Sequence, residues 1–241
     1  MIGVFLLFLL CGGIFAGPAE LPFRDDFNAY PIGAISEKPG EFCSLGPWTA
    51  VKRASVIQLV EGIEGSTGKC VKLEHRAGDR PIWLSLGFKP VDKYLRAEVR
   101  VRRADVKSIS TWYIARMAGT KGYSAVTTIK GEEFYYKPGT GKYTRLQRCE
   151  PDTWYTVRVD INFPEKNYDV YIDGKLLKFM LPFHVNKKET ANEASSFQIA
   201  GALEVEGTIF IDSVSIEAIS FEELEKAREE GRKMREKMLG G

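Results

Sequence analysis

The chain has 241 residues, of which 44% are hydrophobic and 27% are charged, and this composition supplies enough apolar material for one well-buried domain. Its 34 basic and 32 acidic residues leave a net charge of only +2, which argues against nucleic acid or an anionic membrane surface as a partner. Two histidines, four cysteines and the lack of GxGxxG and GxxxxGK[ST] strings disfavour a zinc site and a nucleotide or dinucleotide ligand.

The first segment has the features of a secretory signal. Met1–Ala16 carries no charged side chain, and its apolar stretch from Val4 to Leu10 is followed by small residues. This pattern predicts cleavage after Ala16 or Ala19, although no Lys or Arg precedes the apolar stretch and an N-terminal membrane anchor is the alternative. The stretch is shorter than the roughly 20 residues that span a bilayer, so we favour cleavage and expect a secreted chain, extracellular or periplasmic.

Residues 17–219 have the pattern of one domain built from short strands. Apolar and polar side chains alternate with a period of two, and clusters of Gly, Pro, Asn and Asp separate the runs. The clearest runs are Ser55–Val60, Lys69–His75, Ile82–Phe88, Tyr94–Arg103, Thr111–Met117, Ser124–Ile129, Glu133–Tyr136, Trp154–Asn162, Tyr168–Ile172, Ser196–Ile199 and Thr208–Ile219. So many short strands predict an all-β fold, an antiparallel sandwich of two sheets.

Alternation also predicts which side chains face the core. In Tyr94–Arg102 the inward set is Leu95, Ala97, Val99 and Val101, and the outward set is Tyr94, Arg96, Glu98, Arg100 and Arg102. Further along, the inward set is Tyr155, Val157, Val159, Ile161, Tyr168, Val170 and Ile172, and the outward set is Arg158, Asp160, Asp169 and Tyr171. The pair Asp173-Gly174 then supplies the positive φ angles of a type I′ hairpin turn.

A charged helix is expected at the end of the chain, in residues 220–241. Ser220 and Glu223 have the spacing of a capping box, which predicts a helix start. Acidic residues crowd the first half of the segment and basic residues the second half, the order that the helix dipole favours. The helix either lies against the sandwich or projects into solvent, and the alternative is a short segment for self-association.

The cysteines leave two states open. Cleavage of the signal removes Cys11 and leaves Cys43, Cys70 and Cys149, an odd number for an oxidising compartment. A disulfide between Cys43 and Cys70 would stabilise the fold by about 3 to 4 kcal/mol in the chain-entropy model. The alternative is three unpaired thiols that behave as small hydrophobic residues.

Three stretches together resemble the concanavalin A-like, or laminin-G-like, jelly-roll superfamily of lectins and glucanases. They are Phe23–Phe27, the segment from Asp152–Val157 on to Tyr168–Gly174, and Gly207–Val214 as the closing strand. The resemblance implies a jelly-roll arrangement for the two sheets. It implies no single activity, because such folds serve lectins, adhesion modules, hydrolases and lyases.

The resemblance also implies a site for a cation. In these folds the first and last strands lie side by side, which would bring Asp25 or Asp26 near Asp212. Neighbouring carboxylates repel each other unless a cation or a proton lies between them, so we expect a structural Ca²⁺ held by these aspartates and nearby carbonyl oxygens. The alternative is that Asp25 and Asp26 cap a turn while Asp212 makes local hydrogen bonds.

An enzymatic alternative comes from a second resemblance. Arg96-Ala97-Glu98-Val99-Arg100, followed by the segment from Tyr135 to Tyr143, is similar in order to motifs of jelly-roll alginate lyases. This similarity implies that Arg96 and Arg100 would neutralise a uronate carboxylate, beside Glu98, while Tyr143 moves protons. The position of the lyase histidine has no His here, its nearest counterpart being Ile114-Ala115-Arg116. We therefore favour a solvated cross-strand charge ladder for these arginines. The ExDxE string of glucan hydrolases does not occur either.

Carbohydrate binding is the function that we favour. Aromatic rings pack against the apolar faces of sugar rings, and arginines bond the hydroxyl groups. The candidate ligand-binding residues are Trp112, Tyr135, Tyr136, Tyr143, Arg96 and Arg100, with Tyr113 and Tyr123 among the further aromatics of this region. The expected partner is a polysaccharide or glycan. The alternatives are a structural cell-surface component with no small ligand and the lyase described above.

Overall fold

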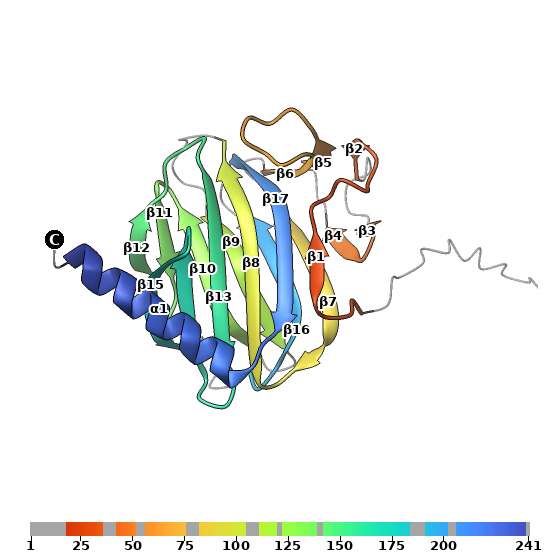
Figure 1. The fold of residues 1–241 in the computed structure, drawn as a ribbon. Coiled ribbons are helices and arrows are strands. Elements are labelled where there is room, and N and C mark those ends of the chain that lie inside the picture. Colours follow the sequence, from red (N-terminus) through yellow and green to blue (C-terminus); the bar gives the residue numbers. More distant parts are fainter. Residues whose placement is uncertain are drawn as a thin grey trace, which may run out of the picture.

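The computed structural model describes residues 18–35, 42–51, 56–75, 82–104, 111–119, 122–138, 142–183, 191–201 and 206–239. Two antiparallel sheets are stacked face to face, and one helix follows them at the end of the chain (Figure 1). The expected signal segment, residues 1–16, lies outside the described residues. Within the described ranges, no helix combines the length and the apolar character that crossing a membrane requires. The predicted all-β sandwich with a C-terminal helix is confirmed.

The two sheets divide the strands as follows. The nine-stranded sheet has the order β15 (Lys175–Pro182), β14 (Asn167–Ile172), β13 (Trp154–Asn162), β8 (Tyr94–Arg103), β17 (Gly207–Ala218), β6 (Cys70–His75), β5 (Val56–Val60) and β2 (Gly33–Ala34), and β1 (Phe23–Asp25) also pairs with β17. The eight-stranded sheet has the order β12 (Thr144–Arg148), β11 (Glu133–Tyr136), β10 (Gly122–Lys130), β9 (Thr111–Gly119), β16 (Ala194–Gly201), β7 (Trp83–Val91), β4 (Trp48–Val51) and β3 (Phe42–Leu45). Strands β1, β2, β3, β4, β12 and β15 are additional to the eleven runs that alternation singled out, and the burial pattern of β15 does not alternate regularly.

The opening and closing strands lie side by side. In the register of β1 and β17, Phe23 is opposite Ile216 and Asp25 is opposite Val214. This confirms the neighbourhood that the resemblance implied.

The core lies between the sheets, and alternation places its residues. Leu95, Ala97, Val99 and Val101 of β8 are fully buried, as predicted, and so are Val157, Val159 and Ile161 of β13. Contacts such as Phe134 of β11 against Tyr155 of β13, with ring centroids 5.1 Å apart, join the two layers. Burial of each large apolar side chain stabilises the sandwich by about 1.5–3 kcal/mol.

Three side chains that were predicted to face outward are buried. Asp160 and Asp169 are 0% exposed and Tyr171 is 2% exposed. They do lie on the outer face, but Arg158 stacks 3.8 Å from the Tyr171 ring centroid and pairs with Asp160, and the helix covers Asp169. The predicted outward direction is thus confirmed, but the burial was not anticipated, because period-two alternation identifies a face of a sheet and not what packs on that face.

The predicted turn and helix start are both confirmed. Asp173 and Gly174 have φ angles of 49° and 73°, which are the two positive values that a type I′ turn between β14 and β15 needs. Helix α1 (Phe221–Leu239) begins at the capping box. There the Glu223 N–H donates to Ser220 Oγ over 3.1 Å, and the Ser220 N–H donates to Glu223 Oε2 over 2.7 Å.

Helix α1 both packs and projects. Leu224, Arg228 and Gly231 are buried on the side that contacts the nine-stranded sheet, whereas residues 232–237 are exposed. Figure 1 shows its C-terminal end running past the edge of the sandwich. Self-association through this segment stays a prediction.

The thiols of Cys70 and Cys149 are free and buried, so the disulfide between Cys43 and Cys70 is not formed. Burial raises the pKa of each thiol to about 12. Cys70 also lies 3.6 Å from a carboxylate oxygen of Asp212. The side chain of Cys43 lies outside the described residues.

Candidate functional site

The arginines of β8 belong to a charge ladder on the outer face of the nine-stranded sheet. Arg96 forms a bidentate pair with Asp160, with distances of 2.9 and 3.0 Å, and lies 3.5 Å from Glu217. Arg100 pairs with Asp212 at 2.5 Å and donates to the Gly65 carbonyl over 2.8 Å. The ladder is confirmed, although it is less solvated than expected because Asp160 and Asp212 are fully buried.

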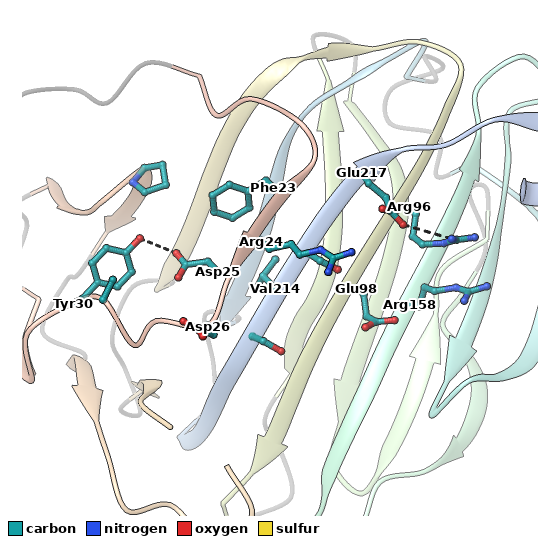
Figure 2. A pocket seen from close by; sticks show the side chains of 14 residues that line it. Phe23, Arg24, Asp25, Asp26, Tyr30, Arg96, Glu98, Arg158, Val214 and Glu217 are labelled. Atoms are coloured by element: carbon teal, nitrogen blue, oxygen red, sulfur yellow. Dashed lines mark hydrogen bonds and ion pairs between the residues drawn. The ribbon is translucent and has the colours of Figure 1, made fainter. Parts of the chain in front are cut away.

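A cavity of about 820 Å³ adjoins this ladder and is lined by residues of β1, β8, β13, β17 and the loop after β1 (Figure 2). Across its middle the register places Arg24, Ser215, Glu98 and Arg158 in one row. The small Ser215 leaves room between longer side chains of opposite charge. Because positive and negative groups alternate here and Arg96 and Arg158 share Asp160, the charges of this cavity largely compensate one another.

The aspartates of the expected cation site have other partners. Asp25 accepts hydrogen bonds from the Phe27 N–H, the Tyr30 hydroxyl and the Trp48 indole, each at 2.8 Å. Asp26 accepts from the Asn28 N–H at 3.0 Å. Both carboxylates therefore serve the turn after β1, as in the capping alternative.

The carboxylate of Asp212 also accepts hydrogen bonds from neighbouring groups. It accepts from the N–H and the hydroxyl of Thr67, at 2.9 and 3.0 Å, in addition to Arg100. Donors that point at these oxygens compete with a cation, so Asp25, Asp26 and Asp212 do not fit a shared Ca²⁺ ligand set in this arrangement. Across the described ranges, no group of three or more His, Cys, Asp or Glu side chains could hold a metal ion.

The residues of the lyase alternative are not brought together. Arg96, Glu98 and Arg100 lie on β8 of the nine-stranded sheet, whereas Tyr143 directly precedes β12 of the eight-stranded sheet and faces away from the core. The two groups thus occupy opposite faces of the sandwich. The lyase arrangement is wrong for this chain because a shared order along the sequence does not decide which sheet a strand joins.

Two of the candidate ligand-binding aromatics belong to the core. Trp112 is 1% exposed and Tyr136 is 9% exposed, and both side chains belong to the hydrophobic cluster between the sheets. The prediction that they contact a ligand is therefore wrong. Alternation around each of them gives the reason, because Tyr113 and Tyr135, their neighbours in sequence, face outward instead.

The outward aromatics gather on the eight-stranded sheet and form what we call the tyrosine face, comprising Tyr113, Arg116, Tyr123, Tyr135 and Tyr143. The hydroxyl groups of Tyr113 and Tyr143 are 3.1 Å apart and hydrogen-bonded. The ring centroids of Tyr135 and Tyr143 are 6.4 Å apart, at an interplanar angle of 79°. Burial and the Tyr113 hydroxyl raise the pKa of Tyr143 well above its ordinary value, so this phenol is protonated at neutral pH.

Arg116 is held between two of these rings. Its guanidinium carbon lies 3.6 Å from the ring centroid of Tyr123 and 5.3 Å from that of Tyr113, which is cation–π geometry. The register of β9 shifts between Tyr113 and Arg116 against both of its neighbours, β10 and β16. This irregularity inserts one residue into the alternation, so that Tyr113 and Arg116 share a face although they are three residues apart.

A pocket of about 460 Å³ opens beside the tyrosine face, lined by Lys130, Tyr135, Lys137, Lys142 and Tyr143. The ammonium group of Lys137 lies 5.5 Å from the Tyr143 ring centroid. Sequence reasoning identified Tyr135 and Tyr143 as ligand contacts but missed Arg116 and the lysines. Lys130 and Lys137 directly follow the predicted strands Ser124–Ile129 and Glu133–Tyr136, and this spacing could have pointed to the positive charge of the pocket.

Comparisons with known proteins bear on the fold. No protein-family model and no curated protein matches the chain. A solved sialidase has a TM-score of 0.65 at 14% identity, with 83% of this chain and 18% of that chain covered. The globular domain of T. cruzi calreticulin has a TM-score of 0.53 at 15% identity, with 90% of this chain and 98% of that chain covered. A carbohydrate esterase of the Shiga toxin-encoding bacteriophage phi24B has a TM-score of 0.51 at 16% identity, with 73% of this chain and 91% of that chain covered.

The chain thus spans only 18% of the length of the sialidase. Likeness at such low identity concerns the fold alone, which is a β-sandwich of two antiparallel sheets.

Proposed function

We propose that the chain is a secreted, concanavalin A-like carbohydrate-binding or adhesion module whose ligand lies on the tyrosine face. The observation that carries this proposal is the convergence of Tyr113, Tyr135 and Tyr143 on one outer surface beside an open pocket. Two or more partly exposed aromatics beside a pocket suit sugar recognition, because a sugar ring presents both an apolar C–H patch and a rim of hydroxyl groups.

Two further points support the assignment. Two of the proteins with a similar fold, the sialidase and the carbohydrate esterase, have names that refer to carbohydrate substrates. The apolar, uncharged segment Met1–Ala16 fits export to a compartment in which polysaccharides are met. Binding without catalysis is the simpler function, because the arginines of the lyase alternative form ion pairs on the opposite sheet.

Glycan arrays, followed by isothermal titration calorimetry on each hit, test the proposal. Tyr135→Ala and Tyr143→Ala should each weaken binding about tenfold or more, equivalent to about 1.4 kcal/mol. Phe179→Ala is the matched control, because Phe179 is also an exposed aromatic, 41% exposed, but lies on β15 of the other sheet. Its affinity should equal that of the native chain.

Two outcomes would overturn the assignment. Equal losses in the control and in the tyrosine variants would place the ligand elsewhere. No binding to any plant, algal or bacterial glycan by the folded chain would favour a surface component with no small ligand.

A further inference from the structure

We infer that the tyrosine face selects acidic glycans, and that Arg116 with Lys130, Lys137 and Lys142 binds their carboxylate or sulfate groups. This inference rests on the proposed function and names the class of ligand. The feature behind it is positive charge that the protein itself leaves uncompensated.

Arg116 is the centre of this charge. Among the described residues it has no carboxylate partner, and its only close contacts of this kind are the rings of Tyr113 and Tyr123. Burial lowers the pKa of Arg116 below its usual value, which reflects the cost of holding a cation there without a counter-ion. A guanidinium stacked over a ring face directs its N–H groups outward along its edge, and their spacing fits the two oxygens of a carboxylate or sulfate.

The lysines extend the charge around the pocket. None of Lys130, Lys137 and Lys142 forms an ion pair in the part of the chain that the structure describes, whereas the nearby Glu133 is engaged by Arg145 at 2.8 Å and by the Tyr135 hydroxyl. Three lysines thus line the pocket with Tyr135 and Tyr143, Arg116 lies near Tyr143, and the carboxylate beside Tyr135, that of Glu133, is already paired with Arg145. An anionic chain lying on these rings would find a counter-charge at each side.

Other buried or half-buried arginines show that this arrangement is unusual within the molecule. Arg96, Arg100 and Arg228 each hold a buried carboxylate, and Arg103 donates to the carbonyls of Gly131 and Cys149. The larger cavity on the nine-stranded sheet mixes both signs of charge. The tyrosine face is thus the surface on which an external anion supplies what the fold lacks.

The probes are polygalacturonate for carboxylates, dextran sulfate for sulfates and unmodified dextran as the neutral polymer, each titrated calorimetrically at low and high salt. We expect at least one polyanion to bind at least tenfold more tightly than dextran, and its affinity to fall as salt rises. Arg116→Gln should weaken polyanion binding at least tenfold. Lys137→Gln, at a partly exposed position, is the second variant should Arg116→Gln fail to fold. Arg232→Gln removes the same charge from helix α1, which packs on β15 of the other sheet, and should leave the affinity unchanged.

The outcomes distinguish selection of acidic glycans from glycan binding in general. Equal affinity for dextran and both polyanions, lowered by Tyr135→Ala but not by Arg116→Gln or Lys137→Gln, would overturn the acidic class and leave glycan binding standing. An equal loss in Arg232→Gln would show that total charge binds the polymer, which also overturns the inference. No binding of any glycan would remove both proposals.

Discussion

A buried ion pair between Arg228 and Asp169 joins helix α1 to the sandwich. Removing this ion pair should lower the free energy of unfolding strongly, by an amount that depends on pH. The Arg228 guanidinium donates from Nε to Asp169 Oδ2 over 2.7 Å, and from Nη2 to Asp169 Oδ1 and Asn167 Oδ1 over 3.2 and 2.9 Å. The side chains of Arg228 and Asp169 are 6% and 0% exposed. Arg228→Met keeps the length of the apolar stem but leaves the buried Asp169 carboxylate with the Met180 N–H, at 2.7 Å, as its remaining donor among the described residues.

Breaking one side of a buried pair typically costs about 3–5 kcal/mol, and we expect a loss of about 3 kcal/mol in the free energy of unfolding at pH 7. With a urea slope of about 2–3 kcal/mol per molar, the unfolding midpoint should fall by about 1 M. Asp169→Asn together with Arg228→Met should recover about 2 kcal/mol, because no charge is then left unpaired. Tryptophan fluorescence and circular dichroism should report coincident transitions in all variants.

The pH dependence follows from the direction of the Asp169 shift. Burial, the largest cause, raises the pKa of Asp169 above its ordinary value even though Arg228 opposes the shift. A carboxyl whose folded-state pKa is raised contributes most to stability below the unfolded-state pKa, and this contribution is lost as the pH rises through the folded-state pKa. Without Arg228 the shift should grow. The destabilisation by Arg228→Met should therefore shrink as the pH falls from 7 towards 4, and a loss that is equal at both ends, or under about 1 kcal/mol at pH 7, would refute this account.

Further expectations concern the helix, the thiols and the cation site. Gly231→Ala should lower the melting temperature although alanine favours helices, because a Cβ there would lie 2.5 Å from the Cβ of Leu176, whereas Glu230→Ala at an exposed position should not. The thiols of Cys70 and Cys149, with pKa values of about 12, should stay unreactive towards a disulfide reagent at pH 8 in the folded chain and react once it is unfolded in urea. Since hydrogen-bond donors occupy the aspartates of the expected calcium site, EDTA should leave the calorimetric melting midpoint unchanged. A lower midpoint in EDTA would restore that site.

The sequence by itself determined the local features. The alternation in Tyr94–Arg103 and Trp154–Asn162 predicted those strands and the core faces of both, because a half-buried strand repeats its environment every two residues. Asp173-Gly174 predicted the hairpin turn, and Ser220 with Glu223 predicted the helix start, because in both cases the interacting groups lie within four residues of each other.

Only the tertiary structure decided what covers a face and which strands share a sheet. Asp169 is buried because Arg228 of helix α1, 59 residues later in the chain, packs over it. The alternation within β14 carries no information about this contact.

The candidate site depends on the same kind of non-local information. Strict alternation would send Arg116 and Tyr113 to opposite faces, and the irregularity in β9 that unites them is visible only against its neighbouring strands. Arg96 and Tyr143 are parted because pairing, which joins segments far apart in the chain, assigns them to different sheets. Periodicity is a property of one strand, whereas a binding surface is a property of several strands and of the register between them.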